Sequence, residues 1–316
     1  MSAPHSPTIF DDALTRWLLE GDISLQYQVE RDLFGAERSE IKDRIANEGW
    51  GARFLGQVGA GGYWGKGFYN PKWTSTHYTL LDLKNLGIGP GNGIISKALG
   101  FVLNTRRGAE GGLLPTGRNR KSDICVNGMF LNYASYFKTE EKDLEPVVDL
   151  ILHERMADGG FNCESNKRGA RHSSMHTTIS VLEGILEYSR GGYNYGLPEL
   201  KEAEKTSREF LLNHRLFRSH RTGELMDPKM LMLSWPSRWR YDILRVLDYF
   251  QDSGTAYDQR MQDALEVLVR KRRADGRWPL QGRHPGQVHF EMEKTGKPSR
   301  VNTLRALRVL KHFTTA

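Results

Sequence analysis

A short turn rich in glycine recurs along this 316-residue chain, and its spacing limits the fold more than any other sequence feature. The first residues of successive copies lie 50, 48, 64 and 53 positions apart. A period near 50 residues is too long for a single helical hairpin with a minimal loop. The five copies are Ala60-Gly61-Gly62-Tyr63-Trp64, Glu110-Gly111-Gly112-Leu113, Asp158-Gly159-Gly160-Phe161, Thr222-Gly223-Glu224-Leu225 and Asp275-Gly276-Arg277-Trp278.

Helical sequence patterns flank the turns on both sides. An aliphatic stretch that ends near a basic residue precedes several copies, as at 151–155. A polar loop follows, and then a second stretch in which apolar residues recur every three or four positions, for example Ile179 and Leu182. No long alternating strand pattern is present. The sequence predicts an all-α fold that forms a single domain over the whole chain, with N-terminal helices in 1–50 and repeat units in 51–316.

Helical pairs of this kind bury their apolar faces by stacking on neighbours, either in an open row or in a closed ring. A glycine turn followed by an aromatic residue or leucine, best seen at 158–161 and 275–278, resembles the repeat turn of the terpenoid cyclase and protein prenyltransferase superfamily. Bacterial prenyltransferase-like repeat proteins resemble the segments 158–163 and 172–188. The resemblance covers roughly residues 50 to 313 and implies an α/α toroid of inner and outer helices. The starts of the inner helices would then surround the mouth of a central cavity.

Both cysteines fall at these predicted inner-helix starts or just before them. An Asp-x-Cys motif and a His-Thr motif resemble the zinc site of protein prenyltransferase β subunits, which uses one Asp, one Cys and one His. The resemblance implies zinc ligands Asp123, Cys125 and His176, with Cys163 as an alternative to Asp123. Thiolate, imidazole and carboxylate groups are the ligands that zinc prefers. The alternative is a buried pair of thiols beside a histidine that only packs or caps a helix.

Arginine and tryptophan side chains are expected around the other side of the mouth. Guanidinium groups beside aromatic faces suit a carboxylate or phosphate group, so the sequence favours an anionic ligand. The alternative is that the arginines pair with Asp242, Glu291 and Glu293. The expected substrate-binding residues are Trp73, Trp235, Arg238, Trp239, Arg240, Arg300 and Asn302.

Titratable residues near the same mouth are the candidates for acid–base catalysis. They are His77, His172, Tyr241 and Asp242. His77 occupies the same repeat position as His176, and its alternative is a packing or capping role.

Charge and composition limit the partners. The chain carries a formal net charge of +7, but its basic residues are spread out, and the densest run, 270–273, suits the C-terminal end of a helix. No nucleic-acid module accompanies this charge, so no nucleic acid is expected as a partner. Two cysteines cannot form a disulfide framework, and no stretch approaches the roughly 20 apolar residues of a membrane span. The protein is expected to be cytoplasmic, and its oligomeric state stays open.

Three functions fit these features. The first is a zinc-dependent enzyme, a transferase, lyase or hydrolase, that acts on an anionic small molecule in the central cavity. The second is a metal-free toroid lyase or glycosidase that acts on acidic saccharides, with tryptophans that stack on sugars and arginines that neutralise uronates. The third is a non-catalytic binding or scaffold protein. No Asp-x-Asp-Asp stretch is present, so the acid that starts cyclisation in squalene-hopene-type cyclases has no counterpart.

Overall fold

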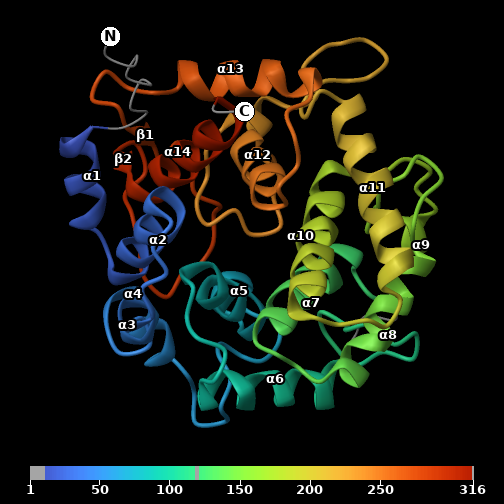
Figure 1. The fold of residues 1–316 in the computed structure, drawn as a ribbon. Coiled ribbons are helices and arrows are strands. Elements are labelled where there is room, and N and C mark those ends of the chain that lie inside the picture. The colour runs from blue at the N-terminus through green and yellow to red at the C-terminus, as the bar shows by residue number, and fades with distance from the viewer. Residues whose placement is uncertain (1–10, 118–120, 315–316) are drawn as a thin grey trace.

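The computed structural model describes residues 11–117 and 121–314, and within them the chain is mostly helical, as the sequence predicts (Figure 1). A small antiparallel sheet pairs β1 (Trp278–Pro279) with β2 (Pro298–Ser299) beside the C-terminal helix. None of the helices in these residues has the length and apolar character needed to cross a membrane. The helices are α1 (Asp12–Leu19), α2 (Ile23–Phe34), α3 (Ser39–Arg44), α4 (Gly49–Leu55), η1 (Lys72–Thr74), α5 (Thr76–Leu86), α6 (Gly93–Arg106), α7 (Ile124–Tyr136), α8 (Glu141–His153), α9 (Ser165–Arg168), α10 (Met175–Gly191), α11 (Leu197–Asn213), η2 (Pro228–Leu231), α12 (Ile243–Asp252), η3 (Gln259–Met261), α13 (Gln262–Arg270) and α14 (Arg300–Thr314).

The five repeat turns share one backbone geometry, which confirms the repeat. In each turn a glycine takes a left-handed conformation with φ between +71° and +95°, which residues with a side chain adopt only at a cost. The amide three residues before this glycine donates a hydrogen bond to the carbonyl of the residue after it, and the fourth copy has one extra residue in this loop. The turn glycines are Gly62, Gly111, Gly159, Gly223 and Gly276.

Threonine side chains of the helix that follows accept hydrogen bonds from the first and third of these turns. The amide of Trp64 donates to Thr76 Oγ1 at 3.1 Å, and the amide of Phe161 donates to Thr178 Oγ1 at 3.0 Å. Trp64 is therefore the equivalent of Phe161, whereas the sequence pattern places Tyr63 at that position. The first copy is shifted by one residue because the second glycine of its pair, rather than the first, takes the left-handed conformation.

Helices α2, α5, α7, α10, α12 and α14 surround the middle of the described molecule (Figure 1). Helix α5 packs on α7, α7 on α10, and α12 on α14. The contact between α7 and α10 is very close because the helices meet at glycines, and a Cβ on Gly184 would lie 2.5 Å from the carbonyl oxygen of Gly128. An ion pair between Arg245 and Glu183, 2.7 Å long, links α12 to α10.

The last helix returns to the first helices. Helix α14 packs against α2, where Arg308 Nη1 donates to Asp32 Oδ2 at 2.8 Å. On its other side α2 reaches α5, where Gln28 Nε2 donates to the carbonyl of Asn85 at 3.2 Å. Helix α2 therefore lies among the same central helices as the repeat units.

Two groups of buried apolar side chains hold the helices together. The first contains Trp64 and Phe130 and joins α4 through α8, and the second contains Leu18 and Trp278 and joins α1 to α12, α13 and α14. Trp50 packs against both groups. Burial of each large apolar side chain contributes about 1.5–3 kcal/mol, so these two groups supply most of the driving force that brings the helices together.

Candidate functional site

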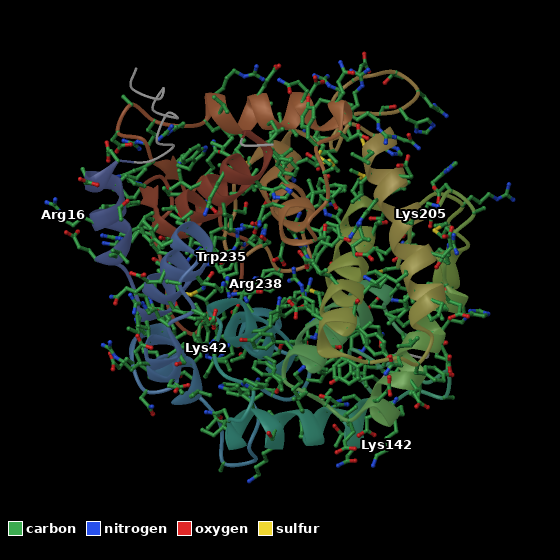
Figure 2. The ribbon with its side chains drawn as sticks, in the orientation of Figure 1. Arg16, Lys42, Lys142, Lys205, Trp235 and Arg238 are labelled. Carbon is green, nitrogen blue, oxygen red and sulfur yellow. The ribbon has the colours of Figure 1, made fainter. Side chains whose placement is uncertain are left out.

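A polar cavity lies in the middle of the described molecule. Residues of α2, α5, α7, α10, α12 and α14 line it, together with the segment 235–238. About 120 Å³ of its interior admits water-sized molecules. Figure 2 shows Trp235 and Arg238 near the centre of the view, whereas Lys142 and Lys205 lie at the periphery. We call this cavity the central chamber.

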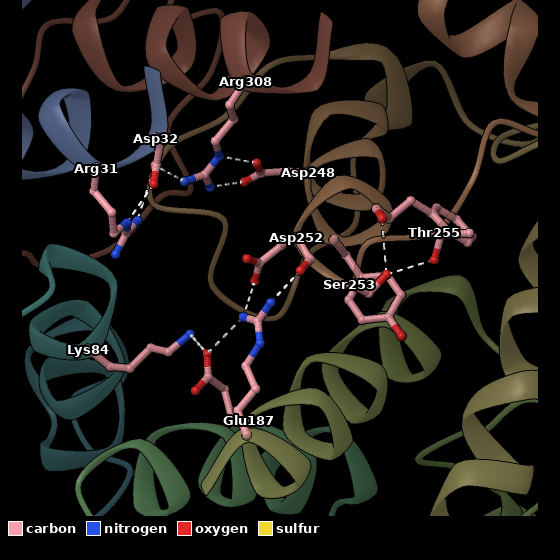
Figure 3. Close-up of polar contacts among 12 residues, drawn as sticks. Arg31, Asp32, Lys84, Glu187, Asp248, Asp252, Ser253, Thr255 and Arg308 are labelled. Carbon is pink, nitrogen blue, oxygen red and sulfur yellow. Dashed lines mark hydrogen bonds and ion pairs between the residues drawn. The ribbon is translucent and has the colours of Figure 1, made fainter. Parts of the chain in front are cut away.

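Every cation in the chamber lining has a carboxylate partner. Arg238 pairs with Asp82 at 2.5 Å, and the two side chains are only 5% and 1% exposed. Arg308 holds both Asp248 and Asp32 in the network that Figure 3 shows. The lining cations are Lys84, Arg238, Arg245, Arg305 and Arg308, and the lining carboxylates are Asp82, Glu183, Glu187, Asp248 and Asp252. The formal charges of the lining therefore balance, five against five.

Five buried polar atoms of the chamber lining have no hydrogen-bond partner among the described residues. A buried polar atom left unpaired costs about 1–3 kcal/mol, so folded proteins usually satisfy such atoms with protein, water or a ligand. The set mixes acceptors with donors. The atoms are Asp82 Oδ1, Asn132 Oδ1, Trp235 Nε1, Ser237 Oγ and Arg305 Nη1.

Two carboxyl groups of the chamber differ in their acidity. Burial raises the pKa of Asp82, and the opposing effect of Arg238 is too small to cancel it. Burial acts in the same sense on Asp248, but there the charges of Arg308 and Arg305 outweigh it and lower the pKa. A pair of carboxyl groups whose pKa values move apart is typical of sites in which one group donates a proton and the other stays ionised.

The sequence interpretation missed most of this chamber. The missed residues Asp82, Asn132 and Arg305 lie inside α5, α7 and α14, among side chains that bury an apolar surface. A charged or amide side chain at a buried position of an otherwise apolar helix is the signal that could have identified them. Trp235 and Arg238, by contrast, were expected to line the cavity and do line it.

The four candidate zinc ligands are not gathered into one site. The two thiols are neighbours, because the amide of Cys125 donates to Cys163 Sγ at 3.1 Å, and both cysteines are free. Asp123 instead pairs with Lys167, and His176 Nδ1 accepts the amide of Tyr241 at 2.8 Å. Among the described residues no group of three or more His, Cys, Asp or Glu side chains could hold a metal ion. The arrangement therefore does not fit the tetrahedral zinc site that the resemblance implies.

The two thiols differ in acidity. The hydrogen bond from Cys125 to Cys163, together with burial, raises the pKa of Cys125, and the same bond lowers the pKa of Cys163. The Thr177 hydroxyl lies 3.4 Å from Cys163 Sγ and also favours its thiolate. Because the amide that reaches Cys163 belongs to the first turn of α7, the dipole of that helix acts in the same direction.

A second cavity lies at the start of α10. His176 lines it with Tyr241 and Arg240, and η2 and the segment 282–285 also line it and contribute Lys229 and His284. The space in it that is accessible to water-sized molecules has a volume of about 270 Å³. Burial and the nearby arginines lower the pKa of both histidines to about 4, so both are neutral near pH 7. We call this cavity the mouth pocket.

A small third cavity borders both of these cavities. It shares Trp235 and Arg238 with the central chamber, and Arg283 and His284 with the mouth pocket. Trp73 is also part of its wall. We call this small cavity the aromatic slot.

Two of the predicted tryptophans flank one lysine near the slot. Lys72 Nζ lies 5.4 Å from the ring centre of Trp73 and 5.6 Å from that of Trp239. Trp73 donates through Nε1 to the carbonyl of Pro285 at 2.7 Å, and Trp239 meets His176 edge to face. The prediction that aromatic faces and cations gather in this region is consistent with these contacts.

Arg300 and Asn302 serve the fold rather than line these cavities. The Arg300 guanidinium lies over the Trp17 ring at 4.6 Å and donates to the Trp17 carbonyl at 2.8 Å. Asn302 Nδ2 donates to the carbonyls of Pro279 and Leu233. Helix α14 starts beside α1, so the Arg300 side chain extends toward the periphery.

The polar groups of Tyr241 and Asp242 already form hydrogen bonds within the fold. The Tyr241 hydroxyl donates to the Leu216 carbonyl at 2.5 Å, and Asp242 Oδ1 accepts the Arg245 amide at 2.9 Å as the N-cap of α12. Burial raises the pKa of both groups. Both residues line the mouth pocket, but their polar atoms already have these partners.

The remaining two catalytic candidates occupy opposite environments. His77 is fully buried among aromatic rings, its Nδ1 lies 3.1 Å from the Tyr133 hydroxyl, and burial lowers its pKa to about 3. This environment matches the packing alternative. His172 is exposed in the loop before α10 and lines none of the three cavities described here.

The comparison with known proteins adds no family. No protein-family model matches the chain, and no curated protein is significantly similar to it.

Proposed function

We propose that this chain is a saccharide-processing enzyme of the α/α toroid class that works without a metal, on a hydroxyl-rich substrate with an acidic group. The toroid interpretation is supported by contacts that run from α2 through α5, α7, α10 and α12 to α14 and back to α2. The substrate would bind in the central chamber, where the inner helices converge.

The five unpartnered atoms of the chamber lining carry this proposal. Asp82 Oδ1 and Asn132 Oδ1 are acceptors, Trp235 Nε1 and Arg305 Nη1 are donors, and the Ser237 hydroxyl is both. Each sugar hydroxyl also donates and accepts, so a saccharide offers partners of both kinds. A prenyl chain would leave all five atoms unpaired, and a small anion would satisfy only the donors. The chamber lining therefore favours a saccharide over the other ligands that the sequence suggests.

Asp82 is the proposed general acid. Its Oδ2 accepts from Arg238, its Oδ1 has no partner among the described residues, and burial raises its pKa, so it takes up a proton more readily than an exposed carboxyl group does. In hydrolysis it would protonate the glycosidic oxygen as the bond to the leaving sugar breaks, and a water molecule would then add to the anomeric carbon and return a proton to the Asp82 carboxylate. Asp248, kept anionic by Arg305 and Arg308, would stabilise the positive charge that develops on the sugar ring.

The other interpretations keep less support. The zinc-dependent transferase stays a prediction, and no step is assigned to zinc because the candidate ligands do not assemble. The cytoplasmic location and the absence of a nucleic-acid partner also stay predictions. A non-catalytic binding protein would use the same chamber, and turnover separates it from an enzyme.

Incubation of the purified protein with neutral, uronate-containing and sulfated oligosaccharides tests the proposal. New reducing ends without unsaturated products indicate hydrolysis, whereas unsaturated uronates indicate elimination. Asp82→Asn should lower turnover by about 100-fold or more and preserve binding, because the amide keeps the shape but has no proton to deliver. Asp43→Asn is the matched control, since Asp43 is an exposed carboxylate on α3. Binding without turnover would identify a binding protein, and the absence of both would contradict the proposal.

A further inference from the structure

We propose that the mouth pocket binds the acidic group of the substrate, a carboxylate or a sulfate, through Arg240 and Lys229. This inference rests on the proposed function and assigns the acidic group to a site outside the central chamber. The arginines of the chamber, which are the more obvious candidates, are excluded because each is already paired with a carboxylate of the protein.

Arg240 and Lys229 form no ion pair with an acidic side chain among the described residues. The Arg240 guanidinium lies over the Trp239 ring at 4.7 Å, a contact that orients the fork but leaves its charge uncompensated. Lys229 is exposed near the start of η2 and also lines the pocket. Two cations that line one pocket and have no ion-pair partner among the described residues can hold a single anionic group together.

Neutral donors complete the pocket. His176 Nδ1 accepts the Tyr241 amide, so its proton is on Nε2, and a lowered pKa keeps the ring uncharged. His284 Nε2 is buried and has no partner among the described residues. A donor in either ring that reaches the ligand adds a hydrogen bond to an oxyanion without adding charge.

The two acidic side chains of the pocket are occupied by backbone amides. Asp227 Oδ1 accepts the Lys229 amide at 2.8 Å, and Asp242 Oδ1 accepts the Arg245 amide at 2.9 Å. Each of these carboxylates caps the start of a helix, so neither of them is placed as a partner for the Arg240 guanidinium.

The aromatic slot is adjacent to both sites. It borders the chamber at Trp235 and the mouth pocket at His284. An extended saccharide with one ring in the chamber would therefore pass the rings of Trp73 and Phe290 before its acidic group reaches Arg240. The acidic group is accordingly expected on a sugar next to the one that reacts, rather than on the reacting sugar.

Calorimetric titration with three probes tests this inference: inorganic sulfate, a neutral oligosaccharide and the same oligosaccharide ending in a uronate. Wild-type protein should bind the uronate form more tightly than the neutral form. Arg240→Gln should weaken binding of the uronate form about tenfold or more and leave the neutral form within about twofold. Arg240→Lys should restore part of the loss. Arg270→Gln is the matched control, because it removes the same charge from an exposed position on α13.

The possible outcomes separate this inference from the proposed function. If both oligosaccharides bind equally and Arg240→Gln changes neither, the inference is wrong while the saccharide function stands. If sulfate binds through Arg240 but no saccharide binds, the anion site stands and the proposed function fails. If Arg240→Gln and Arg270→Gln weaken binding of the uronate form equally, the loss results from the change in net charge, and the inference is wrong.

Discussion

The central chamber and the mouth pocket contain similar residues but use them differently. In the chamber every lining cation is paired with a carboxylate, and the pairs connect segments that are distant in the sequence. In the mouth pocket Arg240 and Lys229 have no such partner among the described residues. The comparison teaches that pairing, rather than composition, separates the cations that hold the fold from the cations open to the acidic group of a ligand. Substitutions in the two regions should therefore have opposite consequences for stability and for binding.

Loss of a chamber carboxylate should have the largest effect on stability. Asp248→Ala leaves the buried guanidinium of Arg305 without its partner and removes one of two partners of Arg308. Breaking a buried pair in this way typically costs about 3–5 kcal/mol, because an uncompensated charge stays in the interior. Urea denaturation measures the change in the free energy of unfolding.

Arg240→Ala supplies the contrast for that measurement. Arg240 has no acidic partner in the part of the chain that the structure describes and is partly exposed, so its loss should change the free energy of unfolding by only about 0.5 kcal/mol. Similar losses in the two variants would break the comparison, because they would show that the mouth pocket contributes to folding as the chamber does.

Much of the fold could be predicted from the sequence because the repeat turn has a strict backbone requirement. Only glycine enters the left-handed conformation cheaply, so its recurrence at Gly111, Gly159 and Gly276 is visible without a structure. The one-residue shift at Gly62 could not be predicted, because a pair of glycines offers two positions and the tertiary hydrogen bond to Thr76 chooses between them.

The site could be predicted less well, for a physical reason. Sequence motifs placed Arg238 and Arg240 close to the start of a helix, and both lie in the segment before α12, but the direction of a side chain depends on its neighbours. Arg300 extends to Trp17 on α1, and His176 turns its Nδ1 toward a backbone amide. Which arginines have carboxylate partners depends on contacts between distant segments, such as the pair of Arg238 with Asp82, and no local pattern contains that information.

Lowering the pH should reduce the stability of the protein through His176 in the mouth pocket. Burial and the nearby Arg245 and Arg240 lower its pKa to about 4, so the folded protein binds this proton less readily than the unfolded chain. Its contribution is therefore complete above pH about 6.5 and is lost as the pH falls toward 4, by an amount on the order of 3 kcal/mol. His176→Asn keeps an acceptor for the Tyr241 amide but does not titrate, so it should lose less stability over this range than the wild type. Parallel pH profiles of the two proteins would contradict the prediction.

The smallest expected change in stability is that of Trp235→Phe, which tests whether an unpartnered atom of the chamber binds a ligand. Trp235→Phe removes the unpartnered Nε1 donor and keeps an aromatic ring near Arg305. Because a buried donor without a partner is a cost, its removal should leave the free energy of unfolding within about 1 kcal/mol of the wild type. The same variant should bind a neutral saccharide several-fold more weakly, since one hydrogen bond, worth about 1 kcal/mol, is lost from the complex. Calorimetry and denaturation of the same preparation measure both quantities. A clear loss of stability with unchanged saccharide binding would show that Nε1 serves the fold, and would place Trp235 with the paired arginines rather than with the ligand.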